Sequence, residues 1–130
     1  MAEATPEVVV RGSVAGFAQE ITVGSHRLFS DEPKDAGGEN AGPSPFELLA
    51  AALGACTSMT LGMYARRKQW QLASVVVRLR HSKALDSMDR DIELTGSLTE
   101  EQRTKLLEIA DKCPVHRTLT QGIKINSRLV

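Results

Sequence analysis

The chain has no excess of either charge: 16 lysine and arginine residues balance 16 aspartate and glutamate residues among 130. A net positive field steers proteins toward nucleic acids and anionic membranes, so we expect neither as a partner. Small molecules or other proteins are the expected partners. The chain also lacks a long spacer, so residues 1–130 are expected to form a single domain.

Cysteine is scarce, and a secretory signal is missing. The N-terminal residues have neither the basic start nor the apolar stretch of such a signal, which favours a cytoplasmic location and a reducing environment. Cys56 and Cys113 are then free thiols at rest. Each is either an inert buried residue or a reactive thiol, and composition alone does not decide between the two.

Only Cys113 has charged neighbours in sequence. Lys112 precedes it, and His116 and Arg117 follow closely. Cations beside a thiol lower its pKa and favour the reactive thiolate. Cys56 has no such neighbour, so we expect any activating cation to come from the segment around Cys113.

Metal and phosphate sites have little sequence support. Cys113 and His116 have a spacing that zinc ligands can use, but no second paired motif follows. His26 and His81 fall in expected strands and are interpreted as ordinary strand residues. No glycine-rich turn of the G-x-G-x-x-G type is present. We therefore expect neither a metal nor an organic cofactor.

Alternation of apolar and polar residues predicts strands in three parts of the chain. The expected strands cover residues 7–14, 17–23, 26–30, 74–81, 89–96 and 123–130. Short connections favour antiparallel pairing. The strand runs are separated by single helices, so the sequence predicts an α+β fold with the order βββ-α-ββ-α-β.

Two helices are predicted from their start signals. The first begins at a capping box formed by Ser44 and Glu47 and extends to about residue 68. The second begins near Thr99 and ends at Pro114, with Cys113 last on its buried face. Along the first helix, small residues recur at every fourth position and predict close packing against another helix. These residues are Ala50, Gly54, Ser58 and Gly62.

The first helix is apolar on nearly every side. Its Ala, Gly and hydroxyl residues, with a Pro and a Glu at the start, argue against a membrane span over residues 46–64. A helix of this kind has to be buried on most sides. One chain of this length cannot cover it, so we expect an obligate homodimer whose subunits share a core.

Two segments resemble the OsmC/Ohr family. The run 37–56, GGENAGPSPFELLAAALGAC, is similar to that family's loop, central helix and first cysteine. The run 113–119, CPVHRTL, is similar to its second-cysteine segment. The resemblance implies antiparallel sheets wrapped around central helices in an intertwined homodimer. It also implies active sites at the subunit interface.

The resemblance further implies roles for the cysteines. Cys56 would attack a small organic hydroperoxide, and Cys113 would resolve the sulfenic acid as a disulfide that an external dithiol reduces. The organic-hydroperoxide branch has an arginine at the tip of its first hairpin, which residues 14–19 lack, and its carboxylate lies at the position of Phe46. The chain is therefore similar to the OsmC-like branch with CPVHRTL.

Glu47 is the candidate carboxylate by position. From Glu47 to Cys56 a helix rises by roughly 13.5 Å and turns through about 900°, which places them on opposite faces. Glu47 is then either the capping residue of the helix or a group that acts on the partner subunit's thiol. Arg117 and His116 are the candidate activating groups, ahead of the strand residues Arg11 and Arg27.

The sequence leaves two functional hypotheses. The first is a thiol-dependent peroxidase that reduces organic hydroperoxides in oxidative stress defence, using Cys56 and Cys113. The second is a non-catalytic OsmC-like dimer that binds a small apolar ligand or senses oxidation through the same cysteines. The contacts of Cys56 with Cys113 and with the nearest cation discriminate between them.

Overall fold

The computed structural model describes residues 6–130; residues 1–5, part of the stretch assessed for a secretory signal, lie outside the described residues. The chain forms two compact units, one ending at Leu49 and one extending from Ala50 to Val130. Helix α1, Pro45–Lys68, begins in the first unit and continues through the second. The expectation of a single domain stays a prediction.

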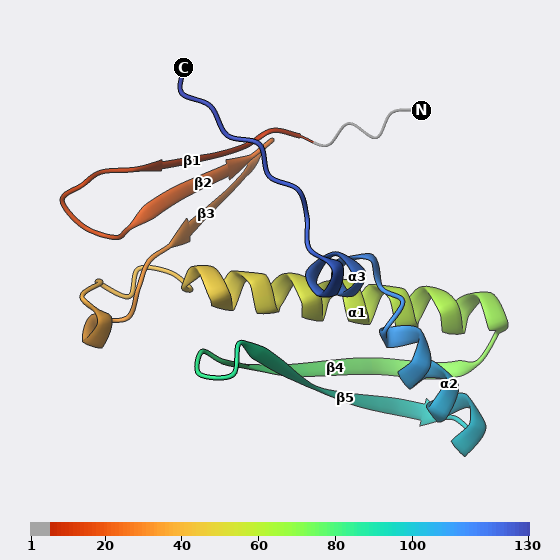
Figure 1. The fold of residues 1–130 in the computed structure, drawn as a ribbon. Helices are drawn as coiled ribbons and strands as arrows, with labels where there is room; N and C mark the ends of the chain where they lie inside the picture. The colour runs from red at the N-terminus through yellow and green to blue at the C-terminus, as the bar shows by residue number, and fades with distance from the viewer. Residues whose placement is uncertain (1–5) are drawn as a thin grey trace. The chain divides into compact units, whose positions relative to one another are not determined.

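The first unit holds a three-stranded antiparallel meander (Figure 1). Its strands are β1 Val8–Gly12, β2 Gln19–Val23 and β3 His26–Ser30. Val8 pairs with Val23 at one end of β1, and Gln19 pairs with Ser30 where β3 ends. The three strands expected from the alternating pattern are therefore confirmed, with slightly shorter bounds.

The loop from β3 to α1 is organised by Asp31. Its carboxylate accepts hydrogen bonds from the amides of Glu32, Glu39 and Ala41 at 2.7, 3.2 and 3.1 Å. The Ala41 bond, followed by the Glu32 bond, keeps the pKa of this carboxyl below its usual value, although burial acts in the opposite direction. A short 3₁₀ helix, Lys34–Ala36, lies within the loop. One ionised side chain thus holds a long connection in place.

Helix α1 begins at the predicted capping box. The Ser44 amide donates to Glu47 Oε1 at 2.8 Å, and the Glu47 amide donates to Ser44 Oγ at 3.3 Å. These bonds satisfy amide donors that the first turn of a helix leaves without partners. The capping interpretation of Glu47 is therefore confirmed.

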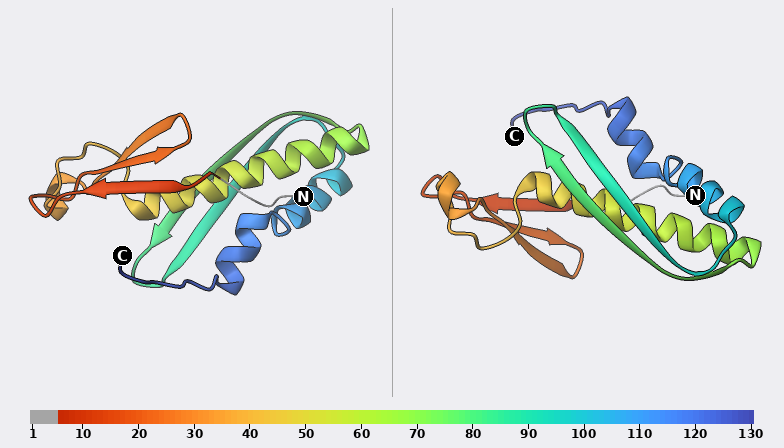
Figure 2. Two further views of the ribbon diagram at one scale, coloured as in Figure 1. Left: turned by 90° about the horizontal axis from the view of Figure 1, so that it is seen from above. Right: turned by 90° about the horizontal axis from the view of Figure 1, so that it is seen from below.

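The second unit is built on a long hairpin with helices packed on one of its faces (Figure 2). Strands β4, Gln71–Ser82, and β5, Ser87–Ser97, pair antiparallel. Helix α2, Glu100–Ala110, begins at the expected box of Thr99 and Gln102. The core joins apolar residues of α1 and α2 to the inner face of the hairpin. Its buried members are Leu61, Leu106, Ile109 and Ala110.

The outer face of the hairpin carries two pairs of opposite charges. Arg78 bonds Glu93 at 2.8 Å, and Arg80 bonds Asp91 at 2.9 Å. Both pairs are exposed, so each contributes little to stability. They agree with the register of β4 and β5, in which the residues between the charged ones, Leu79 and Ile92, face inward.

Two sequence expectations about the C-terminal part are wrong. Helix α2 ends at Ala110 rather than at Pro114, and Pro114 instead begins a third helix, α3, Pro114–Gln121. Proline suits the first turn of a helix, where its missing N–H costs nothing. Residues 123–130 form no strand, and neither of the two sheets of the described residues includes them.

The small-residue face of α1 meets a strand at one point. A methyl group added at Gly54 would lie 2.9 Å from Leu79 Cδ1 of β4. The close approach predicted at Gly54 is therefore present, but to a strand and not to another helix. By length and composition alone α1 could cross a membrane, and 22% of its most apolar window is buried. One such helix is weak evidence for a span, since core helices share these properties.

Candidate active site

The second unit brings the two cysteines together. Cys56 lies in the middle of α1 and is half-buried, whereas Cys113 precedes α3 and is fully buried. Both are free thiols. Hydrogen bonding between the two side chains affects the pKa of each. A pair separated by a hairpin and a helix in sequence is thus in contact in the fold.

The N-terminus of α3 points its amides at both sulfurs. Cys113 is the N-cap residue, and its Sγ accepts the His116 amide at 3.3 Å. The Val115 amide donates to the sulfur of Cys56. Amides in the first turn of a helix are free to donate and carry its positive end. This end of α3 can therefore stabilise negative charge on sulfur.

The pKa of Cys56 lies below its usual value. Burial raises it, but hydrogen bonds from the Val115 amide, the Cys113 thiol and the Thr60 hydroxyl together outweigh that effect. Donors stabilise the thiolate more than the thiol. Cys56 is therefore the member of the pair that ionises more readily.

The pKa of Cys113 is raised. Burial is the largest cause, and hydrogen bonding to Cys56 and the charge of Cys56 act in the same direction, against the His116 amide and the Thr57 hydroxyl. Along the chain Cys113 has cationic neighbours that could lower its pKa, whereas Cys56 has none. The structure shows that amide donors and burial decide the order. The result is a pair in which Cys56 gives up its proton more readily than Cys113.

Arg90 on β5 is the cation at this site, and sequence reasoning missed it. Its side chain is 11% exposed. The guanidinium donates to Thr57 Oγ1 at 3.0 Å, to Asp111 Oδ1 at 3.0 Å and to His116 Nδ1 at 3.2 Å. A guanidinium can only donate, so His116 Nδ1 is assigned as the acceptor in this contact. The sequence did contain a signal for Arg90. It lies two residues before Ile92, so alternation along the strand places both side chains on the inner face.

The other predicted site residues lie elsewhere or act differently. His116 reaches the site through its amide and ring, whereas Arg117 is exposed and its guanidinium forms no ion pair within residues 6–130. Arg27 pairs with Glu20 inside the first unit. Glu47 caps α1. A role for Glu47 on a partner subunit's thiol stays a prediction.

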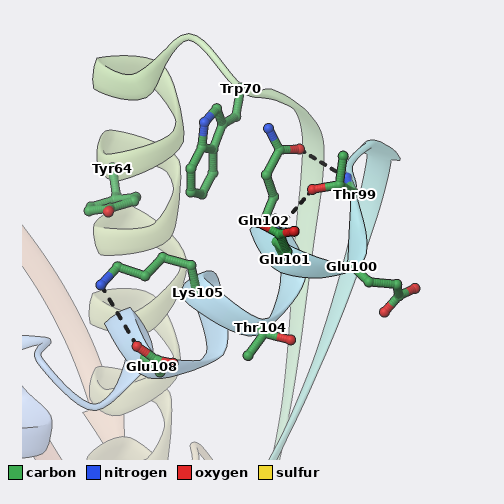
Figure 3. A pocket seen from close by; sticks show the side chains of 9 residues that line it. All are labelled: Tyr64, Trp70, Thr99, Glu100, Glu101, Gln102, Thr104, Lys105 and Glu108. Carbon is green, nitrogen blue, oxygen red and sulfur yellow. Dashed lines mark hydrogen bonds and ion pairs between the residues drawn. The ribbon is translucent and has the colours of Figure 1, made fainter.

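Metal ligands and a ligand groove are the remaining features that a binding site could use. In the described part of the chain, no cluster of three or more His, Cys, Asp or Glu side chains is arranged to hold a metal ion. An open groove lies away from the cysteines, between the end of α1 and α2 (Figure 3). Tyr64 and Trp70 form its aromatic wall, and the polar side of α2 forms the remainder. It contains no nucleophilic thiol.

Comparison with known families identifies the chain. The model of the OsmC-like protein family matches residues 37–128, which include α1, both cysteines and the hairpin between them. The chain belongs to the OsmC family. The resemblance of the two cysteine segments to this family is thereby confirmed. A search of curated proteins found no match.

Solved structures share the OsmC fold across nearly the whole chain. A candidate osmotic stress induced and detoxification response protein from Psychrobacter arcticus has 20% identity and a TM-score of 0.72, covering 91% of this chain and 89% of that one. The organic hydroperoxide resistance protein OsmC from Legionella pneumophila has 22% identity and a TM-score of 0.62, covering 92% and 91%. OhrB of Bacillus subtilis, an organic hydroperoxide resistance protein, has 24% identity and a TM-score of 0.57, covering 90% and 91%. At these identities the likeness establishes the α+β fold.

Proposed function

We propose that this OsmC family member is a thiol-dependent peroxidase that reduces organic hydroperoxides through Cys56 and Cys113. The observation that carries the proposal is the asymmetry of the pair: donors favour the thiolate of Cys56, while Cys113 in contact with it stays protonated. The names of the Legionella and Bacillus relatives, both hydroperoxide resistance proteins, support the same chemistry.

The chemistry takes three steps. The Cys56 thiolate attacks the distal oxygen of the hydroperoxide, the O–O bond breaks, and the alkoxide takes a proton from solvent to leave as an alcohol. Cys56 is then a sulfenic acid. The sulfur of Cys113 attacks it, the S–S bond forms, and the released hydroxide takes the Cys113 proton and leaves as water. The raised pKa of Cys113 keeps that proton in place.

An external dithiol completes the cycle by reducing the disulfide. Cys113 is fully buried and Cys56 is half-buried, so the dithiol reaches the bond at the sulfur of Cys56. Exchange begins at the accessible sulfur and releases Cys113 first as the leaving group. Two electrons pass from the dithiol to the hydroperoxide in each cycle.

Wild-type protein is expected to consume an aryl hydroperoxide catalytically when dithiothreitol is present. Without dithiothreitol it should consume one equivalent per chain and lose both free thiols to a Cys56–Cys113 disulfide. Peroxide assay, thiol titration and peptide mass mapping measure the three quantities. Retention of both thiols after full exposure to hydroperoxide would refute the mechanism.

A second candidate is oxidation sensing without turnover, which the same contact between the cysteines favours. In that case the disulfide forms once, and the oxidised protein itself is the signal. Dithiols do not reduce it catalytically. The assay above separates the two: a single equivalent consumed in the presence of excess dithiothreitol supports the sensor.

We also propose that the chain is an obligate homodimer. On α1, Met59 and Met63 are 73% and 50% exposed in the single chain. Near the C-terminus, Ile123 and Ile125 are 71% and 79% exposed, with no strand formed. Apolar surface of this kind needs cover, and an unpaired segment with alternating apolar residues can add to a partner's sheet.

Sedimentation equilibrium at micromolar concentration is expected to give twice the 14.1 kDa of one chain. The expected dissociation on dilution is accompanied by unfolding, because the core is shared. A folded species with the mass of one chain at every concentration contradicts the dimer.

A further inference from the structure

Arg90 occupies a position where a strand normally places an apolar residue. It lies on the inward face of β5 with Ile92 and Leu94, and its side chain is 11% exposed. Removing a guanidinium from water is costly unless partners replace the lost hydration. Three side chains do so here, and only one of them is a carboxylate. Such an arrangement calls for a reason beyond strand formation.

The partners of Arg90 flank both cysteines. Thr57 follows Cys56 directly on α1, whereas Asp111 and His116 lie on either side of Cys113. One terminal nitrogen, Nη1, bonds Thr57, and the other, Nη2, bonds Asp111 and His116. The planar fork of a single side chain therefore joins α1 to the start of α3.

Arg90 forms no hydrogen bond with either sulfur among the interactions of residues 6–130. The groups that do contact the sulfurs are the Val115 and His116 amides, together with the Thr60 hydroxyl at Cys56 and the Thr57 hydroxyl at Cys113. His116 is held by Arg90 through its ring and bonds Cys113 through its amide. The guanidinium thus acts on the thiols through its neighbours, which are Thr57 on α1 and the N-terminus of α3.

We propose that Arg90 is a positioning residue, whose guanidinium holds the first turn of α3 against α1 so that the Val115 amide reaches the sulfur of Cys56. This inference deepens the proposed function and rests on it for its catalytic meaning. In this role the planar guanidinium matters because its two terminal nitrogens bond different elements. Positive charge alone would not join them. Lysine offers a compact charge that cannot bond both sides at once.

The test measures the pH dependence of Cys56 alkylation by iodoacetamide, with peptide mass mapping to separate the two cysteines. The ionisable groups that meet at the pair are Cys113, His116, Asp111 and Arg90, and the variants change only the last. Arg90→Met is expected to raise the alkylation midpoint of Cys56 by about one pH unit, because the amide donor is lost. Arg90→Lys should restore less than half of that shift.

Arg80→Met is the matched control. Arg80 lies on the neighbouring strand, points outward and pairs with Asp91, so its replacement should leave the Cys56 midpoint unchanged. Circular dichroism verifies that each variant is folded. Asp111→Ala is the second variant, since Asp111 is 68% exposed and its loss removes one anchor with little risk to the fold. It should shift the midpoint in the same direction by a smaller amount.

An unchanged Cys56 midpoint in both folded Arg90→Met and Asp111→Ala would overturn the proposal. Full rescue by Arg90→Lys would also overturn it, because charge alone would then suffice. The readout does not depend on turnover. A shifted midpoint in a protein that reduces no hydroperoxide therefore refutes the proposed function and leaves the positioning role standing.

Discussion

Replacement of Cys56 by serine is expected to lower hydroperoxide consumption by more than ~10³-fold, because the variant loses the nucleophile itself. A serine hydroxyl is not ionised near neutral pH, even where the Val115 and Thr60 donors lower the pKa of a thiol. The measurement is single-turnover loss of an aryl hydroperoxide at one equivalent of protein, followed by peroxide assay.

Cys113→Ser is the matched control for this experiment, since it makes the same atomic change in the other member of the pair. Without dithiol it should still consume one equivalent and stop at a Cys56 sulfenic acid, which dimedone traps for mass mapping. Wild type should instead give the disulfide. Retained consumption in Cys56→Ser together with its loss in Cys113→Ser would reverse the assigned roles.

The pH profile of the same reaction follows from the lowered pKa of Cys56. Thiolate is present above that pKa, so the rate rises with pH and reaches its plateau before the range of an ordinary cysteine, about 8.5. Below the lowered pKa the thiol is protonated and the rate falls. A midpoint at or above that of free cysteine would contradict the donor arrangement.

Replacement of Leu106 by alanine is expected to destabilise the protein by about 2–5 kcal/mol, the second large effect. Leu106 is fully buried on α2 and packs with Leu61 of α1 and the inner face of the hairpin. Truncation removes apolar burial and leaves a cavity between elements that cannot collapse fully. Urea unfolding at a fixed protein concentration gives the free energy of unfolding.

Leu107→Ala provides the control, because it makes the identical change at the next residue of α2. Leu107 is 62% exposed, so the expected change is within about 0.5 kcal/mol. Equal losses in the two variants would place Leu106 outside the core. Wild-type activity per folded molecule should survive both changes, since neither leucine contacts the thiols.

Local signals predicted much of the fold. Both capping boxes formed because their donors and acceptors lie three residues apart, within reach of one helical turn. Strand alternation located both strands of the hairpin, whose inner face carries Ile92 and Leu94. The strand expected over residues 123–130 failed, since alternation shows that a segment can pair and does not supply the edge with which it pairs.

The end of α2 shows the same limit. Pro114 was interpreted as a stop, but proline equally suits a first turn, and the preceding Cys113 caps α3. That ambiguity concealed the α3 N-terminus, and with it the amides that face the sulfurs. Sequence neighbours therefore suggested Arg117 as the activating cation, although it points to solvent.

The sequence by itself determined the α+β class, the element order as far as the second helix, the two candidate thiols and their family resemblance, because periodicity, caps and motifs are local properties of the chain. Only the tertiary structure decided which thiol has the lowered pKa. The donors to Cys56 come from α3, and the burial that raises the pKa of Cys113 comes from packing between elements. The place of Arg90 in the site was likewise decided by tertiary packing. Its partners lie far from it in sequence and meet only when α1, β5 and α3 pack together.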